Sequence, residues 1–471
     1  MRARQDWGAG SVAQLDRTRK VGQLQMQYNR TKSGRNRAKV AATISVAALS
    51  ATGVVVLPSA ASAATTGISG PLKIITWVNP PAVAALTKID QEFQKKYPKV
   101  NVQLETAAND TAGYATLLST SVDSGTADIV TDNNSIQPLP LHANRTTLTP
   151  TELWAASGAY LSLNNQPWIH SFSQAALGLE SYKGNVYGVL SGQYQRVVFY
   201  NKADFAKYHL SVPTTYNQFL TLLKTLKADH VTPLWLGAGS VPPYVQVFLT
   251  QPLMSEVWQP HVAGKNLTTD IQNGSAKWTS PYMVQTMAEE AAIGQYLEPG
   301  YTGVSWEGMP GAFASNKAPM LLDGSWDLAT IHQDNPKLQV GSFPLPGSNV
   351  AADNQPTLQP DLNFEVLKKS HNIPAALAWL KFFASKPIYE QYVDMTGISP
   401  SETGGTYNSF AAGALGKWLG KGIELGTMMP NLVATEGYYD TPTEFPLLQE
   451  AVIAGSKTPQ QAAKLIQGSW K

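Results

Sequence analysis

Short apolar runs and amphipathic segments follow one another in a regular order along this chain. Residues 71–78, PLKIITWV, form an apolar run between prolines, which predicts a buried strand. In residues 82–98 apolar side chains recur at helical spacing. Ala84, Ala85, Ile89 and Phe93 then share one face of an expected amphipathic helix, which a proline ends.

The next three segments repeat this order. Residues 100–106 alternate as a strand, residues 112–125 are helical and end at a glycine, and residues 127–132 predict a third strand. Strand, helix, strand, helix and strand within about 65 residues is the order of a parallel sheet with crossover helices.

The alternation continues to the C-terminus. Further strands are predicted at residues 185–192, 196–201, 231–237, 318–324 and 362–367. Further helices are predicted at residues 214–230, 281–297, 307–316, 325–333, 373–386 and 387–397. Thr214 or Thr215 is expected to cap the first of these helices. The chain is therefore expected to have an α/β fold.

Charge changes the picture at the N-terminus. Ten of the 35 basic and two of the 33 acidic residues precede Val40, which leaves 25 basic and 31 acidic residues in the rest of the chain. A mildly acidic body lacks the electrostatic basis for binding nucleic acid, so no such partner is expected.

The basic N-terminal segment has the pattern of an export signal. It precedes the uncharged apolar run 40–57 and the small-residue site Ala61-Ser62-Ala63, so residues 1–63 are predicted to be a secretory signal peptide, with Met26 as an alternative start. The competing interpretation is a membrane anchor, since about 18 apolar residues barely span a bilayer. The chain has no cysteine, which excludes disulfides, thiol catalysis and a lipid anchor on an N-terminal cysteine.

Aromatic and amide residues gather where the predicted strands end. The five ends read TWVNPP, IVTDNN, LSGQYQ, LWLGAG and LLDGSW. In open α/β sheets, ligands lie at the carboxyl ends of the strands. Flat aromatic rings stack on the C–H faces of a sugar, and amides and carboxylates bind its hydroxyls, so this pattern is typical of a sugar site.

Motifs for other chemistry are missing. The seven histidines are scattered and form no H-x-x-x-H pair, so no metal is expected. Neither a G-x-S-x-G nucleophile turn nor a glycine-rich phosphate loop occurs, so no cofactor is expected. A pair of distant carboxylates for glycoside hydrolysis stays open as an alternative, with Glu307 as its best acid.

Several segments, in this order, resemble the extracellular solute-binding proteins of sugar ABC transporters, the maltose-binding-like class. They are YGVL with RVVFYNKADFAKYHL, then EGMPGAFASNKAPMLLDGSW, FPLPG, IPAALAWLKFFASKPIYEQYVDMTGISP and MMPNLVATEGYYDTP. The resemblance covers essentially Pro71 to the C-terminus. It implies a two-lobed periplasmic-binding-protein-like fold, in which each lobe is a sheet flanked by helices and a three-segment hinge joins the lobes.

The resemblance also implies where the chain crosses between the lobes. The crossings are expected near Leu190–Gln193, Pro356–Asp361 and Ile398–Ser401. Lobe one is expected at residues 71–191 and 361–399, and lobe two at residues 192–360 and 400–471.

The function that follows is capture of a neutral sugar or oligosaccharide between the lobes, without catalysis. The protein is expected to be exported, to act as a monomer and to deliver the sugar to the permease subunits of an ABC importer. Two features depart from the family. Retention through a lipidated cysteine is not available, and TLQPDLNFEV lacks the glycine pair often found before this strand.

Ten residues are candidate ligand contacts. By resemblance, Trp326 stacks on the sugar from lobe two, and Tyr439 or its neighbour Tyr438 stacks from a late loop. From the strand ends, the other candidates are Asn79, Trp77, Asp132, Tyr194 and Trp235, and the segment SWEG adds Trp306 and Glu307. Gly324 is expected to adopt an unusual backbone angle before Trp326, and Ser325 to cap the next helix.

Each candidate has a structural alternative. Trp77, Trp235, Trp306 and Trp326 are large enough to be core residues, and Asp132 is placed to cap a helix. Two other functions also stay open, a secreted carbohydrate-active enzyme that uses Glu307 and a binding protein for a non-sugar solute. The strand ends lack the acids of a polyamine site, and apart from Arg196, a little way into its strand, they lack the basic residues of a phosphate site. This lack of charged residues favours a neutral ligand.

Overall fold

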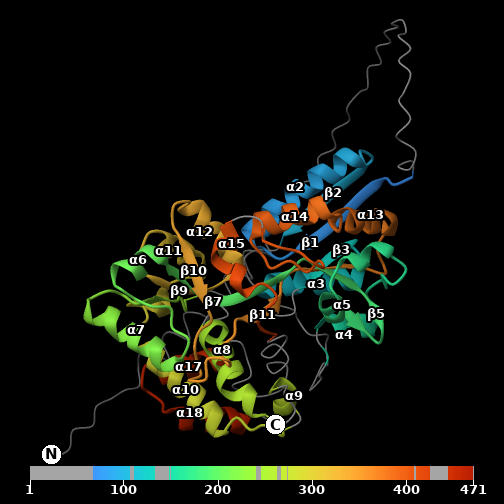
Figure 1. The fold of residues 1–471 in the computed structure, drawn as a ribbon. Helices are drawn as coiled ribbons and strands as arrows, with labels where there is room; N and C mark the ends of the chain where they lie inside the picture. Colours follow the sequence, from blue (N-terminus) through green and yellow to red (C-terminus); the bar gives the residue numbers. More distant parts are fainter. Residues whose placement is uncertain are drawn as a thin grey trace, which may run out of the picture. The chain divides into compact units, whose positions relative to one another are not determined.

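The computed structural model describes residues 67–106, 111–132, 148, 150–239, 245–262, 267–272, 274–407, 410–424 and 444–469. The expected signal peptide, Tyr438 and Tyr439 lie outside the described residues. Strands in the described part form two main sheets, each with its own hydrophobic core (Figure 1). The expected α/β class is thus confirmed.

The first sheet has the strand order β2-β1-β3-β12-β6. Its strands are β1 (Gly70–Thr76), β2 (Val100–Thr106), β3 (Ile129–Asp132), β6 (Gly188–Leu190) and β12 (Asn363–Val366). Strand β1 runs parallel to β2 and β3, as predicted, whereas β12 runs antiparallel to β3 and β6 and makes the sheet mixed.

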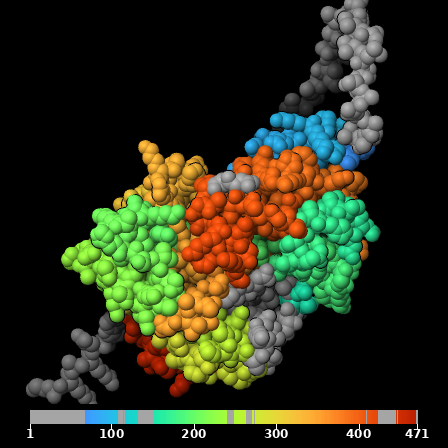
Figure 2. All heavy atoms as spheres, in the orientation of Figure 1, coloured from blue at the N-terminus to red at the C-terminus, as the bar shows by residue number. Residues whose placement is uncertain are grey.

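Helices cover both faces of this sheet because the side chains of β1 alternate between two cores. Leu72 and Ile74 join one hydrophobic cluster, and Ile75 joins the other. The helices and short strands of this part are α2 (Pro80–Lys96), α3 (Thr111–Ser124), α4 (Pro150–Ser157), α5 (Gln174–Leu179), β4 (Ser181–Tyr182), β5 (Asn185–Val186), α13 (Ile373–Phe383) and α14 (Lys386–Thr396). Helices α2 and α14, distant in sequence, pack side by side (Figures 1 and 2).

In helix α2 the hydrophobic pattern predicted most of the buried face, but not all of it. Ala85, Ile89 and Phe93 are fully buried, as expected, but Ala84 is exposed, and Ala82 faces the core in its place. Asp90 is also buried and accepts a hydrogen bond of 2.7 Å from the indole N–H of Trp379 on α13. The buried face of α2 therefore includes one polar position that the pattern did not mark.

The second sheet has the order β13-β11-β7-β9-β8, with β10 paired to β7. Its strands are β7 (Gln193–Asn201), β8 (Leu234–Trp235), β9 (Met320–Gly324), β10 (Val340–Phe343), β11 (Thr357–Pro360) and β13 (Ile423–Glu424). Strand β7 is central and runs antiparallel to β9, β10 and β11.

Helices around this sheet bury its core, and a further helical cluster adjoins them. The helices are α6 (Lys202–Lys207), α7 (Tyr216–Ala228), α8 (Gln251–Leu253), α9 (Leu267–Gln272), α10 (Pro281–Gly294), α11 (Met309–Ala314), α12 (Leu328–Asp334), α15 (Phe410–Leu415), α17 (Glu444–Ile453) and α18 (Pro459–Ser469). Thr215 caps α7 by accepting from the Gln218 amide, as one of the two predicted caps. Helices α9, α10, α17 and α18 share a separate core that includes Trp258 and Trp278.

The chain passes directly from one sheet to the other at two points. Ser191–Gly192 join β6 to β7, and Asp361–Leu362 join β11 to β12. Ser399 pairs with Gln193 beside the first passage. The buried Tyr389 hydroxyl of α14 donates to the Ser191 carbonyl at 2.8 Å and accepts from the Ser401 amide at 2.6 Å.

Candidate functional site

The turn after β9 places Trp326 against its own strand. Gly324 is extended, with φ −94° and ψ 155°, so the expectation of an unusual backbone angle is wrong. Its requirement for glycine is steric, because a Cβ at this position would lie 2.0–2.2 Å from three atoms of the Trp326 ring. The indole therefore lies over the Gly324 backbone, and any larger residue at position 324 would displace it.

Ser325 does not cap the following helix, as the sequence had suggested. No side-chain cap is present at the start of η7 (Ser325–Asp327) or of α12. The Ser325 hydroxyl instead accepts a hydrogen bond of 3.0 Å from the Gln195 amide on β7. The serine therefore fixes the turn to the neighbouring strand.

Two aromatic side chains hold the Trp326 ring. Tyr194 meets it edge to face, with ring centroids 4.4 Å apart and an interplanar angle of 87°, and Phe248 lies at 5.7 Å. Such edge-to-face pairs are favourable beyond the area that they bury. Trp326 is partly exposed, whereas Tyr194 is only 5% exposed. Trp326 thus rests on the core and presents part of its ring outward.

The antiparallel pairing of β7 with β9 brings these residues together. Arg196 lies opposite Gly324, so the beginning of β7 meets the end of β9. Tyr194 and Arg196 are two residues apart and point to the same face of the sheet. The strand end LLDGSW and the segment LSGQYQ therefore lie side by side, although more than one hundred residues separate them.

Arg196 contributes a buried guanidinium next to this aromatic pair. Its Nη1 donates to the Gln251 Oε1 at 2.6 Å, and its Nη2 donates to the Gln359 Oε1. Its Cζ lies 5.7 Å from the centroid of the Tyr194 ring. Sequence reasoning did not select Arg196, Gln251 or Gln359, because their convergence depends on the strand pairing.

Two buried carboxyls flank Trp326 in sequence. Burial raises the pKa of Asp323 well above its usual value, and the neighbouring Asp327 charge raises this pKa further. Burial also raises the pKa of Asp327, while side-chain hydrogen bonds from Asp323 and Trp326 partly offset this rise. Burial therefore favours the protonated form of both carboxyls at this turn. The Asp323 Oδ1 accepts a hydrogen bond of 2.7 Å from the Gly324 amide, which holds this carboxyl against the turn.

The other predicted residues of this part lie around β8. Trp235 pairs with Leu321 across β8 and β9 and is partly buried. Residues 301–305 cover the end of β8, since the Gly239 amide donates to the Val304 carbonyl at 2.8 Å. Trp306 follows partly buried, and Glu307 is exposed.

The first sheet carries the remaining candidates. Trp77, partly exposed after β1, meets Tyr114 of α3 edge to face at 5.6 Å, and its amide donates to the Thr131 hydroxyl at 3.3 Å. The Asn79 side chain caps α2 by accepting from the Ala82 amide at 3.4 Å.

Asp132 ends β3 opposite Asn363, a fully buried residue that sequence reasoning missed. Among the described residues, the Asn363 Oδ1 has no hydrogen-bond partner, which marks this strand end as a further polar position. The placements of Trp77, Asn79 and Asp132 leave their roles as ligand contacts a prediction.

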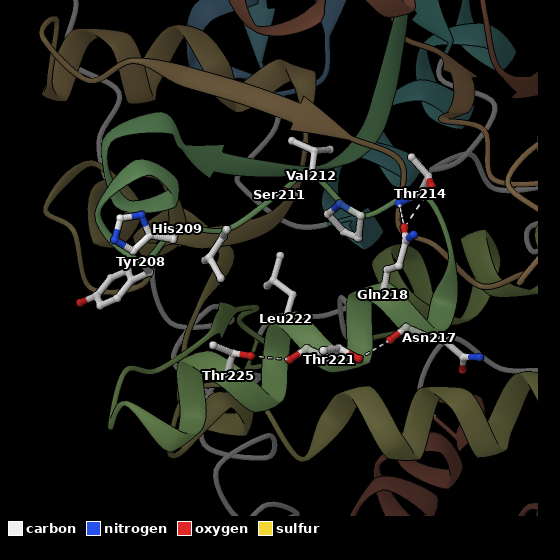
Figure 3. A pocket seen from close by; sticks show the side chains of 12 residues that line it. Tyr208, His209, Ser211, Val212, Thr214, Asn217, Gln218, Thr221, Leu222 and Thr225 are labelled. Carbon is white, nitrogen blue, oxygen red and sulfur yellow. Dashed lines mark hydrogen bonds between the residues drawn. The ribbon is translucent and has the colours of Figure 1, made fainter.

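A pocket of about 590 Å³ lies elsewhere, between residues 208–214 and α7 (Figure 3). Thr214 and Gln218 are joined by a hydrogen bond at its rim, and Leu222 and Val212 line it. None of the predicted site residues lines this pocket. We therefore place the candidate site at Trp326, where the aromatic and polar strand ends meet.

The described residues hold neither a metal-binding cluster nor a membrane-spanning helix. No group of three or more histidines, cysteines and carboxylates is arranged to hold a metal ion in that part of the chain. No helix within it is long and apolar enough to cross a membrane.

Comparison with known proteins gives a consistent result. A family model described as bacterial extracellular solute-binding protein matches residues 78–390. The Multiple sugar-binding protein of Streptococcus mutans serotype c is 26% identical over 317 residues, which are 67% of this chain and 71% of the relative.

Solved structures share the fold at low identity. A structure of SBP RafE in complex with raffinose has a TM-score of 0.69 at 17% identity, over 85% of this chain and 99% of that chain. A sugar transporter from Bacillus licheniformis in complex with stachyose has a TM-score of 0.66 at 16% identity, over 85% and 99% of the two chains. These likenesses confirm the expected two-lobed fold.

Proposed function

Since the chain belongs to the bacterial extracellular solute-binding proteins, we propose that it captures a neutral sugar or oligosaccharide and delivers it to the permease subunits of an ABC importer. The observation that carries this proposal is the partly exposed Trp326 ring, held edge to face by Tyr194 at the end of β9. An exposed aromatic face with hydrogen-bonding groups nearby suits the alternating C–H and hydroxyl surface of a sugar.

The relatives support a sugar as the ligand. One is named for binding multiple sugars, and two structures of the same fold hold raffinose and stachyose. Burial raises the pKa of both carboxyls near Trp326, which favours their uncharged forms beside a neutral ligand.

We propose that two lobes close on the sugar, with lobe one at residues 71–191 and 361–399 and lobe two at residues 192–360 and 400–471. Support comes from the sheets, because β6 and β12 belong to one and β7 and β11 to the other. The second passage lies at Asp361–Leu362, at the C-terminal end of the range expected from the sequence.

The purified protein is expected to bind sugar and leave it unchanged. Raffinose, stachyose and a chitin oligosaccharide are suitable first probes in a thermal-shift screen. A sugar at 100 times its Kd adds about 2.7 kcal/mol to the free energy of unfolding. Chromatography of the same mixtures after long incubation measures turnover. Accumulating product that Glu307→Gln abolishes would favour the secreted enzyme, whereas stabilisation by a polyamine or a phosphate ester would favour a non-sugar solute.

The mature protein is expected to begin at Ala64. The site Ala61-Ser62-Ala63 after the apolar run 40–57 motivates this proposal. Mass spectrometry of protein secreted from cells that express the full chain measures the N-terminus. Recovery of an intact segment 40–57 in the membrane fraction would contradict cleavage and support an anchored protein.

A further inference from the structure

Arg196 occupies an unusual position for a charged residue. It is 5% exposed and lies on the central strand β7, opposite Gly324 of β9 and Thr357 of β11. Burying a cation is costly unless its donors are hydrogen-bonded. Two neutral amide oxygens accept from it, on Gln251 and Gln359, and both side chains are themselves buried. The guanidinium is thus held in place from the sheet and from α8.

The guanidinium in turn contacts the aromatic pair. Its Cζ lies 5.7 Å from the ring centroid of Tyr194, within the range of a cation–π contact. Tyr194 meets Trp326 at 4.4 Å, and Trp326 lies over Gly324. Guanidinium, phenol ring, indole and strand backbone therefore form one continuous series of contacts.

We infer that Arg196 is a positioning residue that fixes Tyr194 and, through it, the orientation of the Trp326 ring. With 5% of its surface exposed, Arg196 offers a ligand almost no contact of its own. Its effect on binding comes from preorganisation, since a ring already in place loses less freedom when the sugar binds. This inference rests on the proposed function, because the orientation of Trp326 affects affinity only where a sugar uses it.

The geometry requires arginine rather than lysine. Two separate nitrogens of one planar group reach Gln251 on α8 and Gln359 on β11. A lysine ammonium is a compact charge without this planar fork, so it cannot donate to both acceptors in the same geometry. Arg196→Lys therefore keeps the positive charge but no longer fixes Tyr194 and the Trp326 ring. The variant separates an effect of charge from an effect of ring orientation.

The test uses a signal from the free protein together with affinity. In protein labelled with 5-fluorotryptophan, Trp326→Phe identifies the ¹⁹F resonance of residue 326. Arg196→Lys is expected to shift and broaden that resonance in the absence of sugar. It is also expected to weaken binding of raffinose or stachyose, whichever the wild type binds, about tenfold, which corresponds to about 1.4 kcal/mol.

Controls separate positioning from general loss of stability. Leu226→Val in the buried face of α7 destabilises the same core away from the contacts of Arg196 with the aromatic pair. It is expected to leave the ¹⁹F resonance of Trp326 unchanged. Gln251→Met removes one hydrogen-bond acceptor of the guanidinium, and it replaces Arg196→Lys as the test variant if Arg196→Lys does not fold. It is expected to shift the same resonance.

The outcomes are distinct. An unchanged Trp326 resonance in Arg196→Lys, or in Gln251→Met if the first variant does not fold, overturns the inference. A shifted resonance with unchanged affinity overturns it as well, because the ring position would then not govern binding. If the wild type binds no sugar at all, the proposed function fails, and the resonance of the free protein still decides whether Arg196 positions the ring.

Discussion

Trp326→Ala is expected to weaken sugar binding at least about 30-fold, because an aromatic anchor typically contributes 2 kcal/mol or more. The same change is expected to lower the free energy of unfolding by less than the about 3–5 kcal/mol typical of a buried aromatic residue. The reason is that Trp326 is partly exposed, although it packs on Tyr194, Phe248 and the Gly324 backbone. Titration calorimetry and urea unfolding of the one variant measure both quantities.

Trp258→Ala is the matched control for this prediction. Trp258 is 1% exposed and belongs to the separate core of helices α9, α10, α17 and α18. It is expected to show the full loss of stability, with affinity retained in the folded fraction. If Trp326→Ala instead loses as much stability as Trp258→Ala and keeps its affinity, Trp326 is a core residue and the proposed site is wrong.

The protein is expected to be more stable near pH 5.5 than near pH 8. Burial raises the pKa of Glu290 to about 8 and those of Asp90 and Asp361 to about 7. Between the unfolded and folded pKa values, the native state therefore binds more protons than the unfolded state. The free energy of unfolding then falls as pH rises. The stabilisation that these protonated carboxyls provide at low pH is lost by the time the pH passes their folded pKa values of about 7–8.

Glu290→Gln tests the source of this effect. The Glu290 Oε1 accepts from the Thr250 hydroxyl at 3.0 Å, and the glutamine oxygen can accept the same bond without carrying a charge. Because one pKa unit corresponds to about 1.36 kcal/mol, Glu290 alone accounts for roughly 2–3 kcal/mol between these pH values. Urea unfolding at both pH values measures the difference, which the variant is expected to reduce.

Glu105→Gln supplies the comparison, because Glu105 is a partly exposed partner of Lys73. The pH dependence is expected to stay as in the wild type. A wild-type protein that is equally stable at both pH values, or a Glu290→Gln variant with an undiminished slope, would contradict the prediction.

Periodicity in the sequence predicted most of the elements because it reflects burial. Strand β2 begins and ends as expected, the helices α7 and α13 lie within their predicted ranges, and α14 begins and ends one residue earlier than predicted. Ala84 shows the limit of this reasoning, since a run of alanines and other small residues specifies the buried face of a helix only loosely. The mixed direction of the first sheet was not predicted, because β12 comes from a distant part of the chain.

At the candidate site, the residue types in the sequence pointed to the correct neighbours, but the sequence did not predict how their side chains are arranged. Tryptophan and tyrosine at strand ends pointed to Trp326 and Tyr194, which the structure brings together. The role of Gly324 was predicted wrongly. Glycine is needed there because the Trp326 indole lies close to its backbone, and such a tertiary contact cannot be read from the backbone angles that glycine favours. Arg196, Gln251 and Gln359 converge only through antiparallel pairing and a short helix, neither of which a sequence motif encodes.

The position of β12 between β3 and β6 sets an order in which this polypeptide can fold. Until Asn363 has been synthesised, β3 and β6 have no strand between them, so the first sheet cannot be completed. Contacts between such distant segments carry a large loop-closure entropy and slow folding. A nascent chain of this topology therefore cannot complete its first sheet until β12 has been synthesised, late in translation.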